Sequence, residues 1–171
     1  DESCGEKSQE KAMYWYREAI KNGSASAGYL MFIDLMSGKL DISDNEIINA
    51  LKLSANKGYI PSYYMLAILD ANEGKTEQEG AWYKKGAEQG DLMGMIYYGC
   101  WLSAIKHNKQ QALYWLRKAA NAPNLSDYLS NRQLKKEGMK TAEDIQQLVY
   151  KVEHDIAIPA PVPVIGSNNH S

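Results

Sequence analysis

Residues 82–90 read Trp82-Tyr83-Lys84-Lys85-Gly86-Ala87-Glu88-Gln89-Gly90, and this segment has three further versions in the chain. The other versions begin at Trp15, Ala50 and Trp115, so successive copies are offset by 35, 32 and 33 residues. Each copy follows the same broad order: an apolar or aromatic pair, a stretch of charged and small residues, and then a helix-breaking residue. A repeat of this period predicts structural units that stack on one another.

The residues within and between these copies are typical of helices. Pro61 is the only proline among the first 122 residues, and Ala, Leu, Met, Lys, Glu and Gln, which favour helices, dominate that stretch. Glycine separates the apolar segments, and glycine in the left-handed conformation is a common helix stop. The glycines that we expect to end helices are Gly23, Gly38, Gly58, Gly74 and Gly90. The spacing predicts a series of short antiparallel helices.

The pattern W-Y-x-K-A-A-x-Q-G, followed by a helix with small residues, resembles the Sel1-like repeats, which are relatives of the tetratricopeptide repeats. Residues 82–91 are the nearest copy, and the resemblance covers residues 8–137. It implies an all-α fold, an α-solenoid of about four antiparallel helix pairs, because each pair hides its apolar faces only against the next copy. The small residues four positions after each stop, which let two helices approach closely, are Ala27, Ser62 and Gly94.

Two copies depart from this family pattern. The second copy has Ala50-Leu51 in place of the Trp-Tyr pair. In the fourth copy the small positions become Asp127 and Arg132, so its last helix is polar. A polar outer face is what a terminal capping repeat requires.

The end of the chain predicts a capping helix followed by an extended segment. Thr141-Ala142-Glu143-Asp144 resembles a capping box, and a helix from there to about Glu153 places Ile145, Leu148, Val149 and Val152 on one face. Pro159, Pro161 and Pro163 favour extended geometry. We expect residues 156–165 to pack along a helical surface through alternating apolar residues. Those residues are Ile156, Ile158, Val162 and Val164.

These features predict three parts of the chain. Residues 1–7 are expected to form a flexible arm, residues 8–155 the repeat domain with its capping helix, and residues 156–171 a proline-rich extended tail. We expect Cys100 to be buried as a small hydrophobic residue.

Composition excludes most familiar kinds of site. The 171 residues carry 19 Lys and Arg against 21 Asp and Glu, and 44% of them are hydrophobic. His107, His154 and His170 lie far apart, and no nucleotide-binding glycine motif or catalytic triad spacing is present. We therefore expect no enzyme, no cofactor and no metal. Nucleic acid is not an expected partner, because no aromatic-basic motif accompanies the lysines. No apolar run approaches the ~20 residues of a membrane span.

The repeat positions suggest a binding surface. By analogy with tetratricopeptide repeats, residues six and ten positions after each stop are expected to line the concave side, where an apolar, aromatic wall suits a peptide or protein. This predicted ladder consists of Tyr29, Ile33, Tyr64, Ile68, Ile96 and Cys100. The alternative is that these side chains only close a tight superhelix. We expect Trp15, Trp82 and Trp115 to lie in the core between helices.

Charge is segregated along the chain. Residues 103–140 carry a net charge of +6, whereas residues 1–102 and 141–171 carry −5 and −3. A basic region of this kind can steer an acidic partner. The predicted basic patch consists of Lys106, Lys109, Lys135 and Lys136. The alternative is an ordinary solvated helix face.

The resemblance implies a non-catalytic protein that binds other proteins. Small bacterial proteins with such repeats include interaction scaffolds, secreted modules and immunity proteins that neutralise toxic effectors, phospholipases among them. We expect an immunity protein of the bacterial envelope that acts as a monomer or weak oligomer. The alternative is an adaptor that presents its groove to a peptide.

The first residues bear on location. The chain starts Asp1-Glu2-Ser3-Cys4-Gly5 without Met, which fits either a trimmed start or a removed signal peptide. The second case predicts a periplasmic or secreted protein. Lipid attachment at Cys4 is a weaker expectation, because Asp1 and Glu2 stand where such a site favours apolar and small residues.

Overall fold

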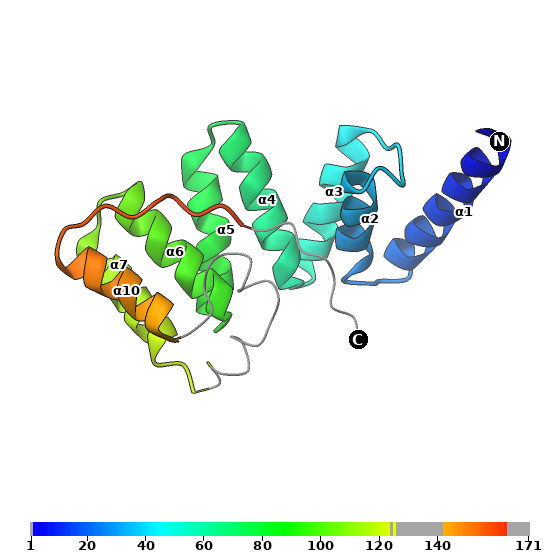
Figure 1. The fold of residues 1–171 in the computed structure, drawn as a ribbon. Helices are drawn as coiled ribbons and strands as arrows, with labels where there is room; N and C mark the ends of the chain where they lie inside the picture. Colours follow the sequence, from blue (N-terminus) through cyan, green and yellow to red (C-terminus); the bar gives the residue numbers. More distant parts are fainter. Residues whose placement is uncertain (1, 124, 126–141, 164–171) are drawn as a thin grey trace. The chain divides into compact units, whose positions relative to one another are not determined.

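The computed structural model of the chain describes residues 2–123, 125 and 142–163. This part of the chain forms eight α-helices and no strand (Figure 1). The helices are α1 (Glu2–Lys21), α2 (Ala27–Met36), α3 (Asp44–Asn56), α4 (Ile60–Asn72), α5 (Thr76–Glu88), α6 (Leu92–Ala104), α7 (Lys109–Ala120) and α10 (Ala142–Glu153). The all-α class predicted from the repeat is confirmed. The polar helix expected around Asp127 and Arg132, and the capping box at Thr141, lie outside the described residues.

The chain divides into two compact units, residues 1–66 and residues 67–171, and the division falls within α4. In the first unit α2 packs against both α1 and α3. In the second unit α6 packs against both α5 and α7, and α10 covers another side of α7. Helices that follow one another in the chain therefore pack consecutively within each unit, as in an α-solenoid of Sel1 repeats.

The helix ends follow from local sequence. All five glycines that were expected to end helices have φ between 73° and 89°, the left-handed conformation that other residues rarely adopt. At the opposite ends, three side-chain oxygens accept a hydrogen bond from a backbone N–H of the first turn. These capping residues are Ser43, Asp91 and Asn108.

Small residues set the distance between paired helices, and Ser62 among them is one of the small residues that the repeat predicts. A Cβ placed on Gly28 of α2 would lie 2.2 Å from the carbonyl oxygen of Ala50 in α3. A Cβ on Gly99 of α6 would lie 2.7 Å from Cγ of Leu116 in α7. Ser62 is fully buried, and its hydroxyl lies 2.6 Å from that of Ser54. These contacts leave no room for larger side chains between the helices.

The prediction that the repeated Trp forms the inter-helix core is wrong. Trp15 is 61% exposed, and Trp82 and Trp115 are half-buried. The core position is the next residue of the repeat, since Leu51, Tyr83 and Leu116 are each 0% exposed. One residue turns a helix by about 100°, so the residue after the Trp faces the paired helix while the Trp lies at the margin.

The capping helix is confirmed for its described residues. Ile145 and Val152 of α10 are buried, and Leu148 and Val149 are half-buried. These side chains lie on one face of the helix, and α10 packs against α7.

Residues 156–163 follow α10 without helix or strand, and in Figure 1 their trace passes from the end of α10 across α6 toward α5. Ile158 and Pro163 are buried, so the segment packs on the second unit. Ile156 and Val162 are 46% and 77% exposed, so the expected strict alternation is wrong. Proline-rich segments favour a geometry with three residues per turn rather than the two of a strand. Val164 lies outside the described residues.

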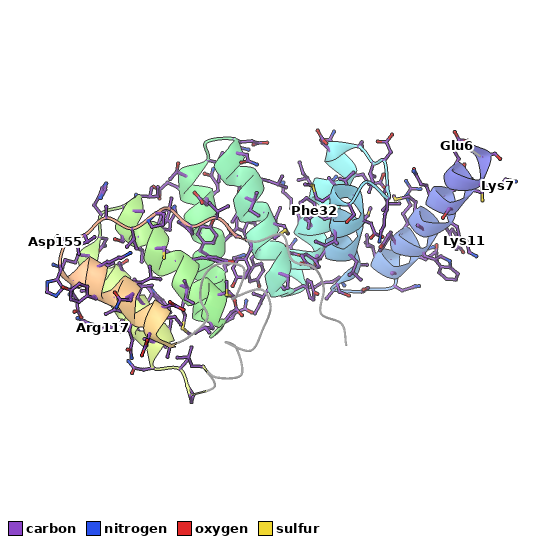
Figure 2. The ribbon with its side chains drawn as sticks, in the orientation of Figure 1. Glu6, Lys7, Lys11, Phe32, Arg117 and Asp155 are labelled. Atoms are coloured by element: carbon purple, nitrogen blue, oxygen red, sulfur yellow. The ribbon has the colours of Figure 1, made fainter. Side chains whose placement is uncertain are left out.

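The first helix begins earlier than the sequence suggested. Residues 2–7, which were expected to form a flexible arm, belong to α1. Glu6, Lys7 and Lys11 project from this helix in Figure 2. Residues 5–12 include Glu, Lys, Gln and Ala, which all favour helices, so helix formation here has a local reason.

Candidate functional site

Most of the predicted ladder lies inside the protein. Tyr29, Tyr64, Ile96 and Cys100 are between 2% and 7% exposed. Ile33 and Ile68 are half-buried and are the ladder residues with the most side-chain surface left for a partner. That the ladder binds a partner stays a prediction, and such binding would depend mainly on these two isoleucines.

Tyr29 illustrates why the ladder is buried. Its ring lies against that of Tyr59, with 5.5 Å between the ring centroids. Burial, followed by the neighbouring Tyr59, raises the pKa of Tyr29 to about 12. The tyrosine therefore contributes apolar area to the first unit and stays neutral at physiological pH.

The described members of the basic patch are engaged in ion pairs. Lys106 Nζ lies 2.6 Å from a carboxylate oxygen of Glu77. Lys109 Nζ lies 3.0 Å from Asp155 Oδ1 and donates to the backbone carbonyl of Glu153 at 2.9 Å. Lys109 thus joins the start of α7 to the end of α10. Lys135 and Lys136 lie outside the described residues, so a joint basic patch stays a prediction.

Four aromatic side chains of the second unit contact one another in a row that is partly buried and partly exposed. We call Tyr98, Trp101, Tyr114 and Trp115 the aromatic strip. Tyr98 stacks on Trp101 with ring centroids 5.9 Å apart and meets Trp115 edge-on at the same distance. Trp115 in turn meets Tyr114 edge-on at 5.1 Å. The strip runs from the buried α6 residues to Tyr114 on α7, which is 58% exposed.

A cation accompanies the exposed end of the strip. Lys118 Nζ lies 5.4 Å from the ring of Trp115 and 5.8 Å from that of Tyr114, one turn away on the same helix. These distances are within the range of cation–π attraction. The side chains of Tyr114 and Lys118 line a cavity of about 570 Å³ together with Met95, Arg117 and Pro123. Arg117 is held by Glu153 of α10 at 2.7 Å.

One feature of the sequence, a tyrosine next to the repeated Trp, indicates this strip but is not part of the repeat pattern. A tyrosine directly precedes the repeated Trp in the first and fourth copies, as Tyr14-Trp15 and Tyr114-Trp115. The first pair also meets edge-on at 5.6 Å, and both of its rings are more than half exposed. A Tyr-Trp pair on a helix margin cannot be fully covered by one neighbouring helix, because adjacent residues point about 100° apart.

A buried carboxylate lies in α5. Glu79 is 8% exposed and accepts a hydrogen bond from the hydroxyl of Tyr83 at 2.8 Å. Burial raises the pKa of the Glu79 carboxyl, the hydrogen bond from Tyr83 opposes this, and the charge of Asp70 adds to it. The next residue, Gly80, leaves room for the ring of Trp101, which would lie 2.3 Å from a Cβ there. Glu79 therefore tethers Tyr83 inside the α5–α6 contact.

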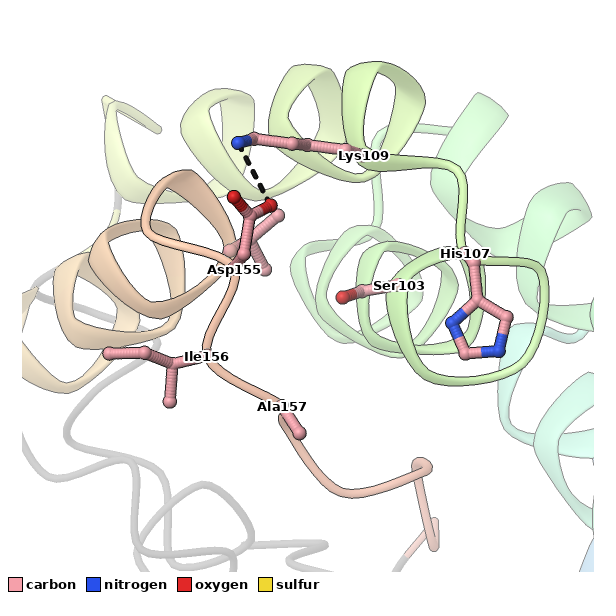
Figure 3. Close-up of a pocket in the computed structure, with 7 residues that line it drawn as sticks. Ser103, His107, Lys109, Asp155, Ile156 and Ala157 are labelled. Carbon is pink, nitrogen blue, oxygen red and sulfur yellow. Dashed lines mark hydrogen bonds and ion pairs between the residues drawn. The ribbon is translucent and has the colours of Figure 1, made fainter.

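A cavity of about 280 Å³ with a mixed polar and apolar lining lies where α6, α7 and the extended segment meet (Figure 3). Ser103, His107 and Asp155 line it, which are the residue types of a hydrolytic triad. A triad needs each of these groups hydrogen-bonded to the next. Figure 3 shows the imidazole of His107 pointing away from Ser103, while Asp155 pairs with Lys109. These three side chains therefore do not form the hydrogen-bonded chain of a triad.

Across the described ranges, no group of three or more His, Cys, Asp or Glu side chains lies close enough together to hold a metal ion. None of the helices that the structure describes combines the length and the apolar character needed to cross a bilayer.

The family comparison agrees with the repeat pattern. The model of the Sel1 repeat family matches residues 3–24, 81–91 and 92–124. The matched segments contain the Trp of the first, third and fourth copies, whereas the second copy, with Ala50, falls outside them. No curated protein and no solved structure matches the chain. The match supports a Sel1-like repeat protein, and such repeats are generally protein-interaction modules, which supports a protein-binding role.

Proposed function

We propose that this protein is a non-catalytic binding protein that neutralises a toxic secreted effector, such as a phospholipase, in the bacterial envelope. The observation that carries the binding part is the exposed end of the aromatic strip beside the cavity of about 570 Å³. Tyr, Trp and Arg dominate the binding energy of protein interfaces. Here Tyr114, Trp115 and Arg117 occur on one helix, next to a hollow that a partner side chain can fill.

Preorganisation supports inhibition by a rigid surface. Tyr114 and Trp115 brace each other, Lys118 lies over both rings, and Arg117 is held by Glu153. A surface whose side chains are ordered before binding loses less conformational entropy on association, which favours tight complexes. Tight binding is what an inhibitor of a toxic enzyme requires.

The experiment combines toxicity and affinity. A candidate toxic effector encoded beside this protein is co-expressed with it in a bacterial host, and binding is measured by calorimetry. Neutralisation predicts survival and a nanomolar or tighter Kd. Replacing Tyr114 by Ala should weaken binding by roughly thirtyfold or more, as for an interface hot spot. Tyr150→Ala is the matched control, because Tyr150 of α10 is also about half exposed but lies outside the strip. Survival that does not depend on Tyr114 would contradict the proposed site.

A second candidate, a peptide-binding adaptor, is favoured by the segment 156–163. This extended, proline-containing stretch already packs on the second unit through Ile158 and Pro163. A helical surface that accepts such a segment of its own chain has the chemistry to accept a similar peptide. Micromolar binding of proline-rich peptides, together with no protection against any effector, would favour the adaptor over the immunity role.

A further inference from the structure

The second copy of the repeat departs from the others at two positions that lie one turn apart. Ala50 stands where the other copies have Trp15, Trp82 and Trp115. Leu53 stands where they have Glu18, Lys85 and Lys118, and it is 47% exposed. Both changes remove a large or charged group from the same side of α3, because residues i and i+3 are neighbours on a helix.

The structure has a cavity at this place. It lies between α1 and α3, has a volume of about 510 Å³ and is lined by Ile20, Met31, Ala50 and Leu53. Met31 of α2 is 1% exposed and belongs to the core of the first unit. The cavity is therefore an apolar groove that reaches down to that core. We call it the Ala50 groove.

Polar contacts join the two walls of the groove and fix their spacing. Arg17 Nε donates to Glu46 Oε1 at 2.9 Å, and its Nη2 donates to the other oxygen at 3.2 Å, so α1 and α3 are joined by a two-point ion pair. Lys57 Nζ, just after the end of α3, donates to the carbonyl oxygen of Gly23, just after the end of α1, at 3.2 Å. The close packing of Gly28 on the Ala50 backbone prevents α2 from moving further in.

The other copies indicate what chemistry suits the position. Trp82 packs at the margin of α5, where its Nε1 donates to Asp70 Oδ2 at 2.9 Å. Trp115 packs against the ring of Tyr98. In both cases the indole lies against the preceding helix of its own unit. Ala50 carries no such indole, and the position borders the open Ala50 groove.

We propose that the Ala50 groove binds a tryptophan side chain of a partner polypeptide, flanked by acidic residues. The inference rests on the proposed protein-binding function and names the chemistry that the partner supplies. An indole would fill the groove and cover its apolar walls, as an interface anchor fills a pocket. Arg17 and Lys21 against Glu46 leave a net positive charge at the rim, which attracts carboxylates on either side of the anchor.

The test uses the full chain labelled with ¹⁵N and two capped tripeptides, Glu-Trp-Glu and Glu-Ala-Glu. Titration with Glu-Trp-Glu should shift the backbone amide signals of Ile20, Ala50 and Leu53 in a saturable way at millimolar peptide. Glu-Ala-Glu should not. Equal shifts with both peptides, or shifts confined to other regions, would overturn the proposal.

Two variants sharpen the test. Ala50→Trp fills the groove with the residue of the other copies, and Leu53→Glu restores a charge at an exposed position where a folding defect is not expected. Each should weaken Glu-Trp-Glu binding by roughly tenfold or more, which corresponds to about 1.4 kcal/mol. Lys52→Ala, an exposed change on the same helix away from the groove, should leave it unchanged. Unaltered binding in Leu53→Glu would reject the site.

The outcomes separate this inference from the proposed function. If Leu53→Glu leaves effector neutralisation intact and Glu-Trp-Glu fails to bind, only the Ala50 groove is refuted. If Glu-Trp-Glu binds in the groove and no effector is neutralised, only the immunity role is refuted.

Discussion

Gly28 lies directly against the backbone of Ala50, since a Cβ on Gly28 would lie 2.2 Å from the Ala50 carbonyl oxygen and 2.6 Å from its carbonyl carbon. The obstacle is backbone, which cannot move aside as a flexible side chain can. The separation of α2 and α3 therefore depends on the absence of a side chain at position 28.

Replacing Gly28 by Ala should destabilise the protein. The added methyl group must push α2 away from α3, and overpacking of this kind costs about 1–3 kcal/mol. Urea unfolding followed by circular dichroism measures the change. Gly5→Ala is the matched control, because nothing lies within 4 Å of a Cβ there. In a helix this control should gain about 0.5–1 kcal/mol, so destabilisation of both variants to the same extent would contradict the contact.

Leu51 and Leu53 should respond differently to truncation although they lie two residues apart on α3. Leu51 is 0% exposed, and its replacement by Ala leaves a cavity that costs about 2–5 kcal/mol. Leu53 is 47% exposed, so Leu53→Ala should change the free energy of unfolding by no more than about 0.5 kcal/mol. The same unfolding experiment decides the matter. Similar losses in both variants would mean that the second residue of the repeat is not the core position.

The extended segment should contribute to stability through Ile158. This side chain is 6% exposed, and Ile158→Ala should cost about 1–3 kcal/mol. Val162→Ala, at a position that is 77% exposed, serves as the control and should be nearly neutral. Thermal unfolding of both variants provides the comparison. A melting temperature unchanged by Ile158→Ala would show that the segment does not hold to the second unit in solution.

Glu79 should make stability depend on pH in a defined direction. Its pKa in the folded state is raised above the ordinary value of 4.5 by burial, so the folded protein binds this proton more tightly than the unfolded chain does. The free energy of unfolding should therefore fall as pH rises from about 4.5 through the folded-state pKa.

The variant Glu79→Gln isolates this effect, because an amide oxygen can still accept the hydrogen bond from Tyr83. The free energy of unfolding of the original protein and of the variant is measured from pH 4 to pH 7. As pH rises, the value for the original protein should fall relative to that for the variant. A difference that is constant or moves the other way would mean that Glu79 is not the buried acid described above.

The series of helices and the residues that end them could be predicted because they depend on local chemistry. The repeat period, the single early proline and the five glycines all act within a few residues of the backbone that they shape. The capping helix could be predicted for the same reason, since the apolar residues of its buried face recur at helical spacing. The buried Ser62 followed from the repeat as well, whereas the close contact of Gly28 did not.

The prediction of which side chains are exposed failed where exposure depends on the neighbouring helices. Tyr64 and Ile96 were expected on an open wall and are buried, while Trp15 was expected in the core and is 61% exposed. A difference of one residue turns a side chain by about 100°, which the repeat pattern alone does not resolve. The aromatic strip was missed because Tyr98 and Tyr114 lie in different helices and meet only through Trp115.

Residue order along the chain was sufficient for the all-α class, the glycine helix ends and the consecutive packing of helices within each unit, because hydrogen bonding and apolar periodicity act over short distances. The hollow beside Ala50 and the exposure of Tyr114 required the packed helices. A cavity exists only when walls from separate segments are fixed at a distance from one another. Here the Arg17–Glu46 ion pair fixes α1, and the Gly28 contact fixes α2, relative to α3.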